Sequence, residues 1–513
     1  MAHPKDVSMV SQLKRAAIDA FMADKHMRIG SHPWAYGPRM DPGGWSFRVT
    51  TPDAHGRGGG EIDVINAPFD DDEPYIARFV KDVFDGMSPQ DHFDRICGRI
   101  DRLVEPWHNL PNTHQLEQIV LDLRQHVFEY LSLEASITGA IKSGPMSGYI
   151  NTLEVESGKL KGDTADTYRL NFTSQMRGVV ASLDVIAYSL MIFMAAQQGL
   201  WQGAREDFGR LLEDAHDQFH AIAEHRGGGS PGDWVPTTLS VVSIAAGVIA
   251  ACIPGGPVAA VTALSVVGIV SGAGGMVADA VLPDAPSVKP GRAGSYEQMM
   301  ILLEQNIGVL NENLKQLEDN IHNNAEVLIS GMGVPFRCGN HPYTISDSVI
   351  AIDASEADSI SMDEQVVNML AATMREIAGV MGSASRVAKM WHAEIRSAVL
   401  RPSSIGRGSI GPSWAVQGLN EALCDRLDDL VSKLLLGADN LNAVSNYHQS
   451  KDGERIAALN SLAAEIEAGS GIDATDYSKT EIGYVPTWER LVEMMSDARV
   501  RNLGVDEGTS EGP

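Results

Sequence analysis

Cysteine and basic residues are scarce in this sequence, and both shortages narrow the range of functions. The 513 residues include four cysteines, which are far apart and form no CxxC pair: Cys97, Cys252, Cys338 and Cys424. This spacing argues against a disulfide framework or a zinc knuckle. Lys and Arg total 40 against 67 Asp and Glu, which gives a formal net charge of −27. Because so acidic a chain repels phosphate backbones and anionic lipid, we expect no nucleic-acid partner, and any membrane contact must be hydrophobic.

Sequence patterns that carry catalysis or cofactor binding are also lacking. The glycine-rich residues 55–61 have no GK[ST] ending, and the acidic residues 69–74 lack the spaced ligands of a calcium loop. His216 and His220 lie four residues apart on one predicted helix face, as in the HExxH zinc pattern, but no third ligand follows at a suitable spacing. A solvated helix face explains this pair better than a metal-dependent hydrolase. We therefore expect a protein that is not an enzyme and holds no metal or other cofactor.

The first residues contain no export leader of the Sec type. Residues 1–28 have neither a continuous apolar segment nor a cleavage site of small residues. Val10, Leu13, Ala17 and Phe21 instead fall on one face of an amphipathic helix. We expect synthesis in the cytoplasm without a signal peptide, followed by leaderless export or association with a membrane or the cell envelope.

Residues 239–278 lack charge altogether, although the chain around them is acidic. PGGP at 254–257 separates two apolar arms, and the longer one, 258–278, would span roughly the 30 Å of a bilayer core as a helix. The mean hydropathy of the whole chain, −0.09, argues against a transporter with many spans. We predict a membrane hairpin, and the alternative is a hairpin buried in a large bundle. The residues that define the predicted hairpin are Trp234, Leu239, Ile244, Ile249, Pro254, Gly255, Gly256, Pro257, Val261, Leu264, Gly268 and Ile269.

Heptad-like stripes of apolar residues predict three long helices in the second half of the chain. The stripes run from Tyr296 to Leu328, from Val367 to Ile395 and from Leu423 to Val444, with apolar residues at alternating spacings of four and three. The Gly- and Pro-rich residues 401–414 separate the last two, which predicts an antiparallel helical hairpin. Short strands are expected only at 47–51 and 61–65. The predicted fold class is all-α, an elongated bundle of long helical hairpins with an apolar helical hairpin in the middle.

Breaks in the helical periodicity divide the chain into six predicted segments. In the first half, helices are expected at about 75–103, 113–141 and 164–225. The segments are an N-terminal helix with irregular chain (1–74), a first helical bundle (75–233), the apolar hairpin (234–282), a linker with a heptad helix and loop (283–362), a second helical hairpin (363–470), and a C-terminal helix with a polar tail (471–513).

The residues around position 160 resemble a turn found in a family of secreted proteins. Leu160 and Gly162 stand where the large type VII (ESX) secretion substrates of actinobacteria have a W-x-G turn between two long helices, and Ala165 and Tyr168 follow at fitting positions. The tryptophan of the family pattern is replaced by leucine here. A literal W-x-G, at Trp201 to Gly203, falls inside a predicted helix instead of a turn.

The resemblance also implies an export signal. The family's signal, Y-x-x-x-D/E after a helix, is matched by Tyr477 and Glu481. The resemblance and the apolar run together indicate a type VII secretion substrate that inserts its hairpin into a membrane, as a pore or channel component. Its apolar hairpin on a bundle of long helices also resembles the α-helical pore-forming toxins. The expected partners are the secretion machinery or a helical protein, a lipid membrane and further copies of the chain. The alternative is a soluble scaffold whose apolar run is core.

Overall fold

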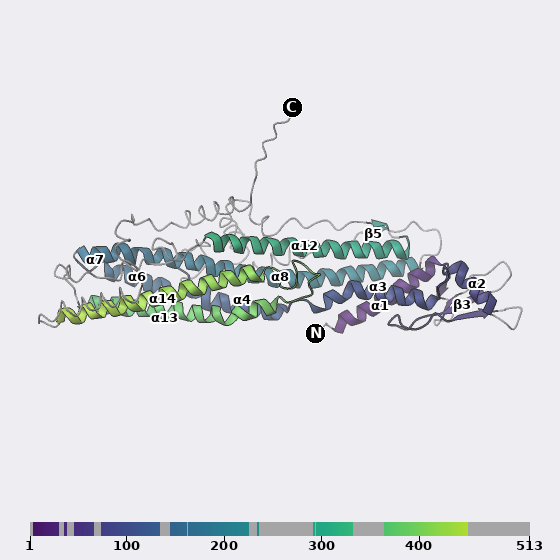
Figure 1. Cartoon of the computed structure of the whole chain (residues 1–513), viewed down its shortest axis with the longest axis horizontal. Helices are drawn as coiled ribbons and strands as arrows, with labels where there is room; N and C mark the ends of the chain where they lie inside the picture. The colour runs from purple at the N-terminus through teal and green to yellow at the C-terminus, as the bar shows by residue number, and fades with distance from the viewer. Residues whose placement is uncertain are drawn as a thin grey trace, which may run out of the picture.

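The computed structural model describes residues 4–29, 35–37, 46–65, 73–133, 144–161, 163–224, 233–234, 291–292, 294–331 and 364–449. Most of these residues are helical, so the predicted all-α class is confirmed. The long helices lie side by side along one axis (Figure 1). The helices are α1 (Pro4–Asp24), α2 (Glu73–Val83), α3 (Pro89–Val104), α4 (Thr113–Leu123), α5 (Glu129–Leu131), α6 (Pro145–Ser157), α7 (Asp163–Tyr168), α8 (Ser174–Glu224), α12 (Tyr296–Gly331), α13 (Glu364–Ala398) and α14 (Ser413–Gln449).

The helix predicted at 75–103 is two helices, because a turn interrupts it. Asp85 and Gly86 have φ of 55° and 84°, a backbone conformation that ends α2. Ser88 then caps α3, since its side chain accepts a hydrogen bond from the Asp91 backbone N–H, and Pro89 occupies the first helical position. The periodicity of α2 and α3 matches across the turn, which is why the sequence suggested one helix.

Two other predicted helices contain π-helical turns. The helix expected at 113–141 is α4 followed by a π-helical turn (Arg124–Phe128) and the short α5, and residues 134–143 lie outside the described chain. The helix expected from about residue 164 comprises α7, a second π-helical turn (Arg169–Thr173) and α8. A 3₁₀ turn, Glu105–Asn109, connects α3 toward α4.

A small antiparallel sheet packs at one end of the molecule, near α2 (Figure 1). Its strands follow chain order: β1 (Arg28–Ile29), β2 (Ala35–Gly37), β3 (Ser46–Thr50) and β4 (Ile62–Ile65). The strands predicted at 47–51 and 61–65 are confirmed as β3 and β4, whereas β1 and β2 are too short to give a periodic signal. The Phe47 ring stacks on Phe79 of α2 at 4.1 Å, which joins the sheet to the helices.

The core is continuous from Val10 to Leu441, and α8 runs through it in contact with α1, α4, α12 and α14. The apolar stripes of α12, α13 and α14 face this core, as predicted, except that Trp391 is half-buried and the side chain of Val444 is not described. Arg375 pairs with Asp439 at 2.8 Å and Lys389 pairs with Asp428. These pairs show that α13 and α14 are antiparallel, so this predicted hairpin is confirmed.

Two short strands bring together chain segments that are far apart in sequence. In the antiparallel pair of β5 (Asp233–Trp234) and β6 (Gly291–Arg292), Asp233 lies opposite Arg292 and Trp234 opposite Gly291. The chain therefore leaves and re-enters the described structure at one place. Residues 235–290, which include the whole uncharged run, lie outside the described residues.

Candidate functional site

The predicted membrane hairpin and export signal fall mostly outside the described residues. The structure gives only the backbone of Trp234, in β5. The other hairpin residues, from Leu239 to Ile269, and the export residues Tyr477 and Glu481 are not described. The membrane hairpin and the export signal therefore stay predictions. The described chain shows how the base of the apolar run is held, through the pairing of β5 with β6.

The W-x-G-like residues occupy two separate places in the structure. Leu160 lies in the connection between α6 and α7 with its side chain in the core, while Gly162 lies outside the described residues. Trp201 and Gly203 are buried within α8, more than two turns from either end of that helix. The literal W-x-G thus forms no turn, as its helix-like surroundings predicted. Trp201 instead packs its fully buried ring against Arg401, whose guanidinium carbon is 4.5 Å from the ring centroid.

A buried ion pair fastens the connection between α13 and α14 to α12. Arg401 and Glu318 pair with each other, and both side chains are 0% exposed. Arg401 also donates to the backbone carbonyls of Val399 and Ile405, at 3.1 Å each, and the Arg407 N–H donates to Glu318 Oε2 at 2.8 Å. Burial raises the pKa of Glu318 to about 7, while Arg401 and the Arg407 N–H act in the opposite direction.

Glycines let the same connection close around the Glu318 carboxylate. Gly406 and Gly411 have φ of 62° and 53°, and a Cβ on either would lie 2.4 Å from a Glu318 carboxylate oxygen. Asn311 of α12 holds the loop as well, accepting from the Gly406 N–H at 2.7 Å and donating to the Ser404 carbonyl at 3.1 Å. The Gly- and Pro-rich residues recognised as a turn are therefore also a clamp on α12, the helix that follows the apolar run.

Helix α8, which was not among the membrane segments predicted from the sequence, contains a long apolar stretch. It is the one described helix that is long and apolar enough to cross a bilayer, and nearly all of its most apolar stretch is buried inside the protein. Core helices of soluble proteins share these properties, so this finding alone is weak support for membrane contact. Inside the protein, α8 serves as the central helix of the core.

An unpaired carboxyl group lies within this apolar stretch of α8. Asp184 is 2% exposed, and its Oδ1 has no hydrogen-bond partner among the described residues. Burial raises its pKa well above the ordinary value for aspartate, so the neutral form is favoured. Tyr188, one turn further along, is also buried, its hydroxyl likewise has no described partner, and its ring lies 5.0 Å from that of Phe128. A lone acidic residue in VVASLDVIAYSL (179–190) was the sequence signal for this site.

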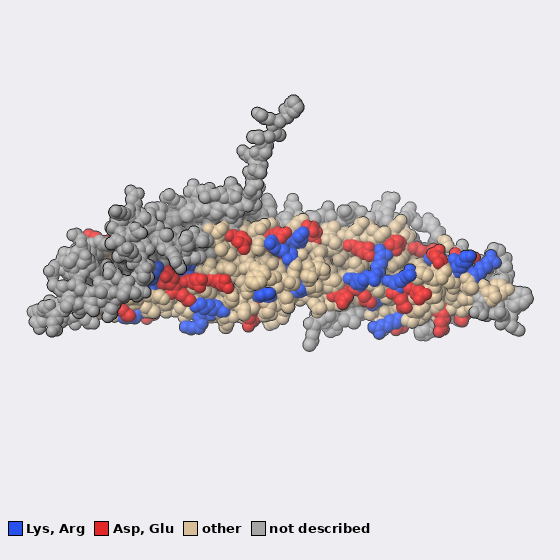
Figure 2. Space-filling model, in the orientation of Figure 1, with Lys and Arg blue, Asp and Glu red and all other residues tan. Residues whose placement is uncertain are grey.

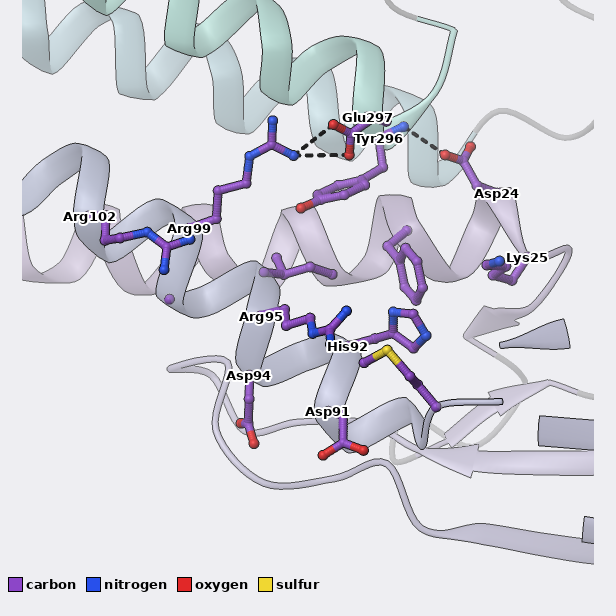
Figure 3. A pocket seen from close by; sticks show the side chains of 14 residues that line it. Asp24, Lys25, Asp91, His92, Asp94, Arg95, Arg99, Arg102, Tyr296 and Glu297 are labelled. Carbon is purple, nitrogen blue, oxygen red and sulfur yellow. Dashed lines mark hydrogen bonds and ion pairs between the residues drawn. The ribbon is translucent and has the colours of Figure 1, made fainter. Parts of the chain in front are cut away.

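A pocket of about 1150 Å³ lies between α1, α3 and the first residues of α12 (Figure 3). Tyr296 begins α12 at the pocket wall, and its backbone N–H donates to Asp24 Oδ2 at 2.7 Å. On α3, Arg99 is held by α12: it donates to Glu297 at 2.8 Å and to Glu304 at 2.6 Å. These ion pairs raise the Arg99 pKa further above its already high value. Tyr296 follows the last residue of β6 by four positions, so the pocket lies close along the chain to the point where it re-enters the described structure.

Charges of both signs line this pocket. The basic residues at the wall are Lys25, Arg95, Arg99 and Arg102, and the acidic ones are Asp24, Asp91, Asp94 and Glu297. The spacing of Arg95, Arg99 and Arg102 in DRICGRIDR puts them on one face of α3, a signal that the sequence analysis missed. Elsewhere on the described face in Figure 2, acidic and basic side chains also alternate without forming a large patch of one sign.

The histidine pair of α8 is not assembled into a metal site. His216 contacts Asp217 at 3.0 Å and His220 contacts Glu224 at 3.4 Å, with the two rings 6.3 Å apart. Within the described parts of the chain, no group of three or more His, Cys, Asp or Glu residues is placed to hold a metal ion. Comparison of the whole chain with protein families, curated proteins and solved structures finds no match.

Proposed function

We propose that this protein is a non-enzymatic, membrane-inserting protein whose apolar run, residues 239–278, enters the lipid bilayer. Assembly of several copies into a pore or channel is the proposed end state. The observation that carries the proposal is the β5–β6 pair, which closes the base of residues 235–290. An uncharged segment that leaves a charged helical body at one place and returns there has the connectivity that a membrane hairpin needs.

The physical chemistry of the run supports the same proposal. No charged residue interrupts 239–278, while the described helices carry ion pairs over their outer faces. The arms are rich in Gly, Ala and Ser, small residues that allow close helix contact in lipid. Because the protein carries a charge of −27, binding to anionic lipid by charge is disfavoured, and the driving force is hydrophobic.

Deletion of residues 236–282 is expected to abolish membrane binding while the described helices stay folded. The deletion removes both apolar arms but keeps β5 and β6. Because these two strands pair with each other, the ends of the deleted segment already lie close together and can be joined without disturbing the described helices. The measurement is flotation of the purified full-length protein and the deletion variant with liposomes. We expect only the full-length protein to float, and Val261→Asp together with Gly268→Asp to suppress liposome permeabilisation by the full-length protein.

The deletion variant needs its own control for folding. Its helical circular dichroism and thermal unfolding should match those of the full-length protein, since the described core runs from Val10 to Leu441. If neither protein floats and the deletion variant is unfolded, the apolar run is core. The protein would then be a soluble scaffold that binds a helical partner, and the membrane proposal would be wrong.

We also propose export by a type VII route, supported by the connection of α6 to α7. Leu160 is buried in the connection between the two helices, at the position where the type VII substrates that this stretch resembles have their W-x-G turn. We expect Tyr477→Ala with Glu481→Ala to remove the protein from the culture filtrate of an actinobacterial host with a working type VII system. Immunoblotting of filtrate and cell lysate measures this. Equal secretion of the double variant and the parent protein would contradict the assigned signal.

A further inference from the structure

The outer side of α13 carries a second heptad stripe, opposite the apolar stripe that packs into the core. Its residues follow one another at alternating spacings of three and four, so they form one seam along the helix. All of them are exposed except Ser383, which is half-buried. The residues of this outer stripe are Met369, Ala372, Glu376, Gly379, Ser383, Arg386, Met390 and Ala393.

Both flanks of α13 are occupied by other helices of the chain. On one flank Lys389 pairs with Asp428 of α14. On the other flank Gln115 of α4 donates a hydrogen bond to Glu394 at 3.1 Å. The outer stripe lies between these flanks, and Figure 1 shows α13 beside α14 at the edge of the bundle. The outer stripe is therefore the side of α13 that the described helices leave uncovered.

The composition of the outer stripe is unusual for a helix face that only meets water. The side chains of Met369 and Met390 are 45% and 56% exposed. Gly379 and Gly382 lie inside the helix, where glycine is less stable than alanine, although a Cβ on either would meet no atom within 4 Å. The monomer thus offers no steric reason for these glycines, whereas close approach of a second helix backbone would require them.

The outer stripe is complementary to itself when its direction is reversed about Met381. At positions equally far before and after Met381, a methionine faces an alanine, a glutamate faces an arginine and a glycine faces a serine. The pairs are Met369 with Ala393, Ala372 with Met390, Glu376 with Arg386, and Gly379 with Ser383. Two antiparallel copies of α13 would therefore place every large side chain against a small one and every charge against its opposite.

We propose that two copies of this chain form a symmetric dimer in which their α13 helices pack antiparallel through the outer stripe. Arg386 of each copy would pair with Glu376 of the other. Within the described part of the chain Arg386 has no ion-pair partner, and the Glu376 carboxylate has only a long hydrogen bond of 3.4 Å from the Tyr149 hydroxyl. Both side chains are exposed and can reach a second copy.

The symmetry of this contact sets its place in a larger assembly. Each copy uses the same surface, so the contact closes with two copies, and a pore of more copies needs another contact as well. As a step toward a pore, the dimer rests on the proposed function. As a dimer in solution without lipid it does not, so the two proposals can be tested apart.

Glu376→Arg and Arg386→Glu are each expected to raise the dissociation constant of the dimer at least about tenfold, because each replaces two attractive contacts by two repulsive ones. Sedimentation equilibrium of the full-length protein without lipid measures this constant, which we expect in the micromolar range for the parent protein. The matched controls are Glu312→Arg and Lys315→Glu, which reverse exposed charges on α12 and should leave the constant unchanged.

Restored pairing distinguishes the antiparallel arrangement from a general effect of charge. The double variant with Glu376→Arg and Arg386→Glu should dimerise like the parent protein, since both ion pairs are re-formed with their signs exchanged. An equal mixture of the two single variants should form a heterodimer, although neither variant dimerises well alone. In a parallel pair like charges would meet in the parent protein, so a double variant that stays monomeric beside a dimeric parent would overturn the antiparallel pairing.

Gly379→Leu tests the close approach of the two helices. The monomer has room for the new side chain, and leucine favours a helix more than glycine does, so the melting temperature of the dilute protein should not fall. Dimerisation should weaken at least about tenfold, because the side chain separates the two backbones. Gly308→Leu on α12 is the matched control, an exposed helical glycine with equal room that should leave the dimer intact.

Two results would overturn the interface. One is a parent protein that sediments as a monomer at about 100 µM, a concentration at which a micromolar dimer is mostly formed. The other is self-association that none of the α13 variants changes. A protein that dimerises through α13 but fails to float with liposomes would keep this inference and remove only the membrane proposal. A protein that floats but stays monomeric in solution would do the reverse.

Discussion

Replacing Glu318 with alanine is expected to lower the free energy of unfolding by about 3–5 kcal/mol. The substitution removes the acceptor for Arg401 and for the Arg407 N–H, and it leaves the fully buried guanidinium of Arg401 without its ion-pair partner. It also opens a cavity between α12 and the loop that carries Gly406 and Gly411. Urea-induced unfolding followed by circular dichroism, together with the melting temperature, measures the loss.

Two further substitutions separate the causes of that loss. Asp319→Ala removes the neighbouring ion pair with Arg407, whose side chains are 38% and 32% exposed, so it should cost less than about 1 kcal/mol. Glu318→Gln keeps an oxygen acceptor while removing the charge. The buried Arg401 guanidinium still lacks a charged partner in this variant, so Glu318→Gln should recover only the part of the loss that comes from the missing acceptor and the cavity. An alanine variant as stable as the parent protein would show that the clamp on α12 contributes nothing.

Replacing Asp184 with asparagine is expected to stabilise the protein by about 1–3 kcal/mol at pH 8. The carboxyl group is buried in α8 with an unpaired Oδ1, and burial raises its pKa well above the value in the unfolded chain. The folded state therefore holds a proton that the unfolded state releases above about pH 4. The free energy of unfolding must then fall as the pH rises from there toward the folded-state pKa. Asparagine does not titrate, so this fall should shrink in the variant.

The measurement is the free energy of unfolding of both proteins at several pH values between 4 and 8. Asp217→Asn on the same helix is the matched control, because the Asp217 side chain is 81% exposed and should have little effect on stability. If the Asp184→Asn variant and the parent protein showed the same pH dependence, Asp184 would be ionised in the folded protein. Reduced liposome permeabilisation by a more stable variant would assign the carboxyl group a role in insertion.

Helix α12 takes part both in the contacts with the 401–414 connection and in the proposed membrane insertion. This helix begins beside the pocket and the base of the apolar run, and its middle is held by Glu318, Asp319 and Asn311. A weakened clamp would therefore affect the helix that follows the proposed membrane segment. The Glu318 variants can be compared in the flotation experiment for this reason.

Local sequence patterns predicted much of the helical part of this fold. The heptad stripes identified α12, α13 and α14 and their buried faces, because a helix places every third or fourth residue on one side whatever its neighbours are. The strands β3 and β4 and the turn at 401–414 also followed from local composition. The single break between α2 and α3 was missed, since capping by Ser88 and Pro89 is a signal of two residues within an otherwise periodic stretch.

Contacts between distant segments were decided only by the tertiary structure. Arg401 meets Glu318 across 83 positions, and Arg99 meets Glu304 across 205. Nothing in the sequence near either partner marks the other, because such pairs depend on which helices become neighbours and in what register. The same holds for the pocket, which combines α1, α3 and α12, and for the closure of the apolar run by β5 and β6. The sequence by itself determined where most of the long helices lie and which of their faces is apolar, whereas packing decided which charges are buried together and where a ligand has room.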